Sequence, residues 1–285
     1  MKTIHKARIK DLLREVNKEW TTYVPQRNVG GDIWYEALPK NEKELDGALK
    51  SIALEDEEVV ISPKDIFFPQ LECMFRFEEH KIQEVVESSP KFVFGSKACD
   101  LAGVLFSDDF FKRGFGDKYY LSRIQDRFLV VIGCLNPPRP RACFCTSAKT
   151  GPFAENGFDW QLVDNGDSYF VETGSQIGED LLEKYGEFFK DPPADAEETI
   201  DYIKRKAYEA VELRVNFQRA LDLMGDDQFS PEETYRRIGE RCIYCGACLY
   251  VCPTCTCFNV FDYLKWGQGA RYRGWDACVF QGYTR

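Results

Sequence analysis

The sequence predicts an α/β or α+β N-terminal domain followed by a small C-terminal module built around cysteines. Short apolar runs alternate with helical patterns over most of the 285 residues, a length that allows one large domain or two smaller ones. Six cysteines fall within sixteen residues, from Cys242 to Cys257. A polar stretch over 226–230 precedes Pro231, which suits the first turn of a helix. We therefore expect one domain over residues 1–228 and a cysteine-rich module over 229–285.

The first domain opens with a helical pattern and continues with strand patterns. Residues 2–20 place apolar side chains at roughly helical spacing among charged ones, which predicts a surface helix with one buried face. Lys91–Phe94 and Phe128–Gly133 are rich in β-branched and aromatic residues and predict two strands. The aromatic stretch over 62–77 is expected either to form an edge of the core or to bind a partner.

The second half of this domain predicts a hairpin and two helices. Asn165-Gly166 is a strong tight-turn signal between the apolar runs 160–163 and 169–172. A helix is expected from Gly178 to about Lys190, where Asp191-Pro-Pro ends it. A long helix is expected from about Ile200 to Gly225.

The cysteine run has the spacing of an iron–sulfur loop. It reads Cys242-Ile-Tyr-Cys245-Gly-Ala-Cys248-Leu-Tyr-Val-Cys252-Pro253-Thr-Cys255-Thr-Cys257. Two-residue spacers aim successive sulfurs at one centre, and a fourth cysteine followed by proline completes the bacterial ferredoxin pattern. Structural zinc also uses paired thiols, but a zinc ribbon separates its pairs by a longer span. The spacing therefore favours a ferredoxin-like [4Fe-4S] module.

Seven C-terminal thiols predict two clusters. In the ferredoxin pattern the fourth cysteine ligates the neighbouring cluster, so the first three need a distant partner, and Cys278 is available. We predict one cluster on Cys242, Cys245, Cys248 and Cys278, and a second on Cys252, Cys255 and Cys257. The second is one ligand short. A non-cysteine ligand, a different partition of the seven thiols or an open iron would each resolve this.

A third thiol group lies in the first domain. Cys99 and Cys134 each follow a predicted strand, and Cys143 and Cys145 close a proline-rich loop after Cys134. Functional residues gather on loops beyond strand ends, so these four thiols predict a third [4Fe-4S] cluster at one sheet edge. Two alternatives stay open: some of the four are small buried hydrophobes, or Cys143 and Cys145 form a redox pair. Cys73 is expected to be a buried thiol that binds no metal.

Composition narrows the class of protein. The net charge of −10 and a pI near 5.0 disfavour nucleic acid, since binding a phosphate backbone depends on lysine and arginine. No apolar run is long enough for a membrane span, and no signal region precedes the first helix. Twelve cysteines in such a chain indicate metal ligation in a reducing cytoplasm. The two histidines, His5 and His80, give little support to histidine-based catalysis.

Two separated stretches together resemble one known family. The first comprises Gly95-Ser-Lys-Ala-Cys99-Asp-Leu, Asp117-Lys-Tyr-Tyr, Cys143-Phe-Cys-Thr-Ser147, Thr150-Gly-Pro, Gly157-Phe-Asp and Val171-Glu-Thr-Gly-Ser175, and the second is the cysteine run with Trp275-Asp-Ala-Cys278. They resemble the iron–sulfur β subunit of soluble sulfhydrogenases and NAD(P)-linked nickel–iron hydrogenases, which is related to the A-type subunit of anaerobic sulfite reductase. Ser96-Lys97 stands where that family usually has Val-Arg, and the family usually continues beyond the Trp-Asp-x-x-Cys region.

The resemblance implies an electron-relay subunit with several [4Fe-4S] clusters. Its partners would be a flavin-containing NAD(P) reductase subunit, together with a catalytic metal subunit of the hydrogenase or another type. The sequence is consistent with a nucleotide site on a partner, because Gly114-Phe-Gly116 lacks the third glycine of a dinucleotide-binding fingerprint. We therefore expect no bond chemistry on this chain alone. The alternatives are the A-type subunit of a sulfite-reductase-like complex, a zinc-stabilised assembly scaffold, and a reductase with an open iron.

Overall fold

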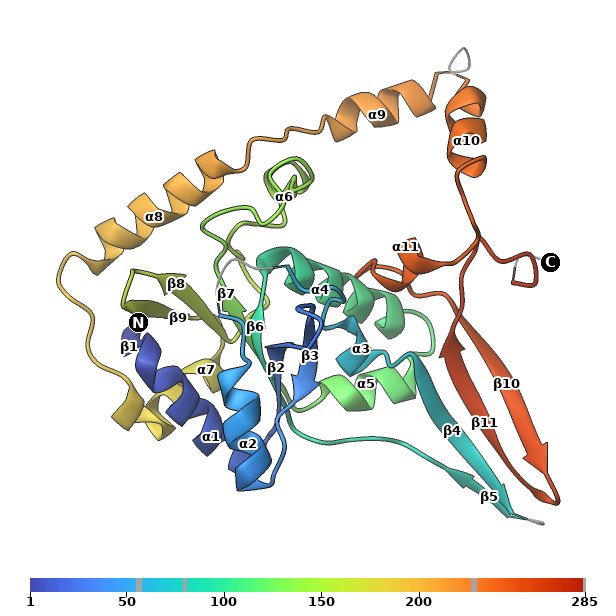
Figure 1. Ribbon diagram of the computed structural model, residues 1–285, viewed down its shortest axis with the longest axis horizontal. Coiled ribbons are helices and arrows are strands. Elements are labelled where there is room, and N and C mark those ends of the chain that lie inside the picture. The colour runs from blue at the N-terminus through green and yellow to red at the C-terminus, as the bar shows by residue number, and fades with distance from the viewer. Residues whose placement is uncertain (55–57, 79–80, 227–229, 284–285) are drawn as a thin grey trace.

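A seven-stranded sheet with helices on both faces forms the body, and a four-stranded sheet projects from one side of it (Figure 1). The computed structural model describes residues 1–54, 58–78, 81–226 and 230–283. The strand orders are β1-β9-β8-β7-β6-β2-β3 and β10-β11-β4-β5. The mixed α/β body expected for the N-terminal part is confirmed.

Parallel strands occupy the centre of the large sheet. Its strands are β1 (Lys2–His5), β9 (Ser168–Thr173), β8 (Trp160–Asp164), β7 (Arg127–Ile132), β6 (Lys91–Ser96), β2 (Thr21–Arg27) and β3 (Ile33–Ala37). β2, β6, β7 and β8 run parallel to one another, and β1, β9 and β3 are antiparallel to their neighbours. All of β6 and most of β7 are buried, as expected for parallel strands covered on both faces. The predicted hairpin is β8–β9, and Gly166 in its turn has φ 81°.

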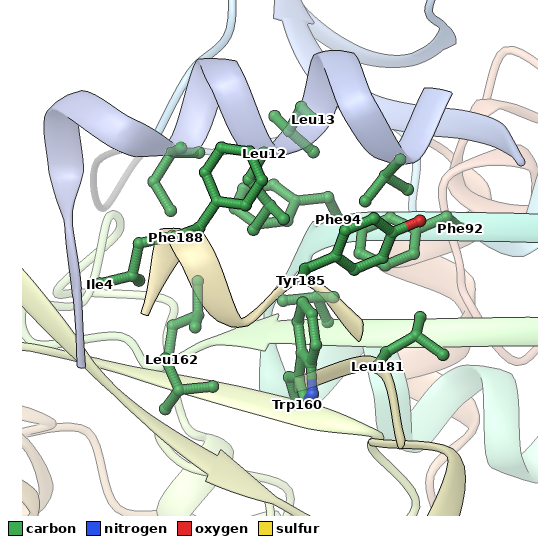
Figure 2. Packing of buried hydrophobic residues seen from close by; sticks show 14 of the residues in the cluster. Ile4, Leu12, Leu13, Phe92, Phe94, Trp160, Leu162, Leu181, Tyr185 and Phe188 are labelled. Carbon is green, nitrogen blue, oxygen red and sulfur yellow. The ribbon is translucent and has the colours of Figure 1, made fainter. Parts of the chain in front are cut away.

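Helices from both ends of the body cover one face of this sheet. They are η1 (Lys6–Arg8), α1 (Ile9–Glu19), α2 (Glu42–Lys50), α7 (Gln176–Lys184) and η2 (Gly186–Phe188). In Figure 2, Leu12 of α1 and Tyr185 after α7 lie over the buried Trp160 of β8. The helix expected over residues 2–20 begins only at Ile9, because Lys2–His5 pairs with β9 as an edge strand.

Three helices cover the other face of the large sheet, and one of them carries Cys99. They are α3 (Lys64–Phe67), α4 (Ala98–Lys112) and α5 (Lys118–Ile124). Their core includes Phe68, Phe111 and Tyr120, with the last two rings stacked at 4.4 Å. A short helix, α6 (Cys145–Ala148), lies in the loop after β7, and α8 (Ala196–Ala210) packs through Ile200 near Phe170 of β9.

The small sheet joins two segments that are far apart in the sequence. β4 (Leu71–Glu78) and β5 (Lys81–Glu84) pair with β10 (Phe258–Lys265) and β11 (Gln268–Trp275) through the β4–β11 ladder. Arg273 of β11 is 1% exposed and forms ion pairs with Glu72 of β4 and Asp117 before α5. Arg123 of α5 also pairs with Glu72, at 2.5 Å. The division after residue 228 stays a prediction, and this sheet crosses it.

The helices of the second half differ from expectation in their bounds. Ser175 caps α7, which ends at Lys184 rather than near Lys190. The long helix expected to Gly225 is wrong: α8 ends at Ala210 and α9 (Phe217–Met224) starts after a break. In the break, Arg214 donates to Thr146 Oγ1 (3.1 Å) and the Val215 amide donates to Ser147 Oγ (2.9 Å). These tertiary bonds hold the backbone out of helical geometry.

Two helices follow before the small sheet is completed. They are α10 (Glu232–Gly239), whose N-cap is Pro231, and α11 (Ala247–Tyr250) inside the cysteine run. α8, α9 and α10 form an arm that runs along one side of the body and leads to the C-terminal segment (Figure 1). In the described part of the chain, no helix is long and apolar enough to cross a bilayer.

Candidate metal centres

Sheet topology places the N-terminal thiols at one edge of the large sheet. β6 and β7 are adjacent and parallel, so the loops that follow them emerge on the same side. Cys99 is the second residue of α4, directly after β6, and Cys134 follows β7. The Cys134 amide donates to Pro152 O at 3.2 Å, and Cys145 begins α6 in the same loop region.

The electrostatics show that these thiols are neighbours. Although the Cys99 side chain is exposed, the protein atoms nearby raise the pKa of its thiol, with further contributions from the charges of Asp100, Cys145 and Cys134. Burial likewise raises the pKa of Cys145, with a further contribution from Cys143. A Cβ on Gly151 would lie 3.4 Å from Cys145 Sγ and 3.5 Å from the Ala98 Cβ. The structure therefore brings Cys99, Cys134, Cys143 and Cys145 into one region.

A second group of thiols surrounds a buried lysine. Lys64, at the start of α3, is 3% exposed, and its ammonium donates to the carbonyls of Cys252 (3.0 Å) and Cys255 (3.3 Å). The pKa of Lys64 is lowered by burial, while the charges of Cys255, Cys252 and Cys257 oppose that shift. The three thiols that the sequence groups in the second C-terminal cluster thus lie around one cation.

The remaining C-terminal thiols are more open. Cys242, Cys245, Cys248 and Cys278 are all exposed. Gly246 has φ 73° and is the N-cap of α11, so it turns the chain between the second and third cysteines of the run. The Tyr244 amide donates to Cys242 Sγ at 3.4 Å.

Cys278 lies on a segment held by both parts of the cysteine run. Two residues earlier, the Asp276 amide donates to Cys257 O at 3.1 Å. Two residues later, the Phe280 ring lies 2.8 Å from the position that a Cβ on Gly246 would occupy. The backbone therefore brings Cys278 to the module, although its sequence position is 21 residues after Cys257.

Helix α4 carries Cys99 and contacts the residue that follows Cys252. A Cβ on Gly103 would lie 2.4 Å from the Pro253 Cβ, so Pro253, next to Cys252, rests directly on the helix. Gly103 follows Cys99 by four residues, about one helical turn or ~6 Å along the axis. The loop after Cys134 also approaches, because Pro138, Arg139 and Val251 line one surface cavity. The N-terminal thiols and the Cys252 group are thus close neighbours in space.

The donor set consists of thiols. Of the two histidines, His5 lies exposed on β1 at the edge of the large sheet, and His80 is outside the described residues. Cys73 sits half-buried on β4 with its Sγ 3.5 Å from Phe75 O. Within the described ranges no disulfide joins two cysteines, and no three acidic, histidine or cysteine side chains converge closely enough to hold a metal ion. The eleven cysteines stay predicted ligands.

Thiolates are the ligands of iron–sulfur clusters and of structural zinc, so the donor set fits either. Comparison with known proteins distinguishes them for the C-terminal part. Residues 241–285 match the family model of a 4Fe-4S dicluster domain. These residues are a 4Fe-4S dicluster domain.

A curated protein is similar over most of the chain. The sulfhydrogenase 2 subunit beta of Pyrococcus furiosus is 28% identical over 233 residues, which is 81% of this chain and 68% of that protein. The resemblance expected from the sequence is confirmed. Together with the dicluster domain, it supports an electron-transfer iron–sulfur subunit. The dicluster domain contains Cys242, Cys278 and the five cysteines between them that the sequence predicts as ligands.

The sequence did not single out Lys64, and it indicated Trp275 only as part of the motif Trp275-Asp-Ala-Cys278. Lys64 contacts residues 188 and 191 positions away, and no local pattern reports such a contact. Trp275 stacks under the Lys64 ammonium, 3.9 Å from Nζ to the ring centroid, and its Nε1 donates to Phe68 O at 2.9 Å. The sequence offered one signal, the proline-flanked stretch 62–69, because functional residues are concentrated on connecting segments that a rigid scaffold positions.

Proposed function

We propose that this chain is the electron-relay subunit of a multi-subunit oxidoreductase of the hydrogenase type. It would pass single electrons between two partners, with a flavin and NAD(P)-binding reductase subunit on one side and a catalytic metal subunit on the other. The sulfhydrogenase subunit beta supports the choice of complex, since its name places it in a hydrogenase assembly. The dicluster domain supports the choice of chemistry.

The observation that carries the proposal is the contact between Pro253 and Gly103. It brings Pro253, the residue after Cys252, to within about one helical turn of Cys99 at the start of α4. A relay needs its redox sites close together in a row, whereas a scaffold has no such need. We propose three [4Fe-4S] clusters, two in the dicluster domain and one on Cys99, Cys134, Cys143 and Cys145.

Each residue group would have its own part in holding the clusters. Bound clusters would supply one-electron redox chemistry, with potentials set by charge, hydrogen bonds and solvent exposure. Cys242, Cys245 and Cys248 are exposed, so a partner subunit could approach them. Of the thiols near α4, Cys99 is also exposed, whereas Cys134, Cys143 and Cys145 are partly buried.

The test follows electrons in the anaerobically purified complex. When NAD(P)H or H₂ is added to the complex, the cluster absorption of this chain should bleach within the turnover time. The same reagents given to this chain alone should leave its clusters oxidised, because in our proposal the sites that bind NAD(P)H and H₂ lie on the partner subunits. Bleaching of the isolated chain by either reagent would overturn the relay function in favour of a reductase.

A further inference from the structure

The buried ammonium of Lys64 lacks an anionic partner among the described residues. Its side chain is 3% exposed, its hydrogen bonds go to two carbonyl oxygens, and its third neighbour is the face of Trp275. In the described part of the chain, no carboxylate forms an ion pair with it. A buried charge is costly unless it is paired. Carbonyls and a ring face compensate only part of that cost.

The groups that can supply negative charge here are cysteines. The Lys64 ammonium interacts with the charges of Cys252, Cys255 and Cys257, besides its sequence neighbour Asp65. Burial raises the pKa of Asp65, an effect larger than the lowering that Lys64 itself causes. Asp65 also accepts the Gln70 amide at 2.8 Å, so its carboxylate is engaged within its own turn. The thiols are therefore the natural counter-charge of Lys64.

We propose that Lys64 is a positioning residue for the second cluster of the dicluster domain, and that its fixed positive charge raises the reduction potential of that cluster. This inference rests on the proposed function, because it needs a cluster on Cys252, Cys255 and Cys257. A cubane held by thiolates is an anion and gains a further negative charge when it is reduced. A buried cation beside it stabilises the reduced form more than the oxidised form.

Lys64 also fixes the backbone that presents the thiols. It bonds to the carbonyls on either side of Pro253 and Thr254, and it is itself held by Trp275, whose indole is tied to Phe68 O. α3 packs in the core beneath the large sheet through Ile66 and Phe67, so the lysine stands on a rigid element. The loop of the second cluster is thus attached to the body through a cation.

The experiment compares Lys64→Met with Lys64→Arg in the anaerobically purified complex, by redox titration followed with EPR. Lys64→Met removes the charge and keeps an apolar stem of similar length. We expect its second cluster to titrate at a lower potential, with the reduced-to-oxidised ratio at fixed poise falling at least tenfold, or 59 mV for one electron. Lys64→Arg should restore much of the shift, and the other clusters should keep their midpoints.

Lys184→Met is the matched control, since Lys184 is an exposed lysine of α7 that pairs with Glu19 at 2.5 Å. It should leave every midpoint unchanged. If Lys64→Met retains all its iron and every midpoint potential, the inference about Lys64 is wrong while the relay function stands. If Lys64→Met loses the second cluster, Lys64→Gln takes its place in the titration, because the amide can still donate to the two carbonyls but has no charge. A second cluster with an unchanged midpoint in Lys64→Gln would show that Lys64 positions the loop without setting the potential, and would overturn that part. If the unaltered complex carries no iron on this chain, the proposed function itself fails.

Discussion

Replacing Gly103 with alanine tests the contact on which the arrangement of thiols depends. The added Cβ would lie 2.4 Å from the Pro253 Cβ and 3.1 Å from its Cγ, whereas carbon atoms in contact sit about 3.5–4.0 Å apart. Pro253 must therefore retreat by about 1 Å or more. Overpacking of this kind costs about 1–3 kcal/mol. The helix itself gains up to about 1 kcal/mol when alanine replaces glycine.

Gly47 in α2 provides the matched comparison. It is an exposed helical glycine with nothing within 4 Å of an added Cβ, so Gly47→Ala should show the helix gain alone. We expect the free energy of unfolding, measured by urea titration, to be about 1–3 kcal/mol lower for Gly103→Ala than for Gly47→Ala. Gly103→Ala should also disturb the cluster near Cys252, seen as a changed EPR line shape. Equal stabilisation by both substitutions, with unchanged spectra, would show that Pro253 does not rest on α4.

Three further changes test other parts of the structure. Glu72→Gln removes the carboxylate shared by the buried Arg273 and Arg123, which should lower the free energy of unfolding by about 3–5 kcal/mol and speed amide exchange in β11. The control is Asp262→Asn, an exposed carboxylate of β10, which should leave that exchange unchanged. Equal exchange in both variants would count against the buried ion pairs. Burial alone would raise the pKa of Glu87, but Lys91 and Arg123 outweigh burial and hold that pKa below its usual value. The ionised Glu87 therefore stabilises the fold fully above about pH 4.3, its ordinary pKa. This contribution to the free energy of unfolding is lost as the pH falls through the lowered pKa. Glu87→Gln should therefore flatten the acid limb of stability against pH by up to one proton, and an unchanged slope would refute the pairing. Cys99→Ser should remove one EPR signal and leave those of the dicluster domain, and loss of all signals or of none would contradict the third cluster.

Local patterns in the sequence predicted the parts of the fold that depend on near neighbours. The runs at 91–94 and 128–133 became β6 and β7, and Asn165-Gly166 became the turn between β8 and β9. These elements are specified by side-chain alternation and turn geometry within a few residues. The dicluster domain was recognisable for the same reason, because its ligand spacing is local.

Other features depend on contacts between distant segments. The break between α8 and α9 follows from hydrogen bonds to Thr146 and Ser147, 68 residues earlier. The pairing of β4 with β11 and the ion pair between Glu72 and Arg273 span about 200 positions. Lys64 reaches the cysteine run across a similar separation. Periodicity contains no information on such pairs, so the small sheet and the cation beneath the thiols emerged only from the structure.

The central claim is that this chain binds a row of iron–sulfur clusters, and metal analysis tests it most directly. Iron, acid-labile sulfide and zinc should be quantified on anaerobically purified protein, with EPR spectra of the reduced state. We predict iron and sulfide for three cubane clusters, with magnetic interaction between neighbours and negligible zinc. Iron for two clusters would remove the site on Cys99, Cys134, Cys143 and Cys145. Stoichiometric zinc with negligible iron would contradict the relay as a whole.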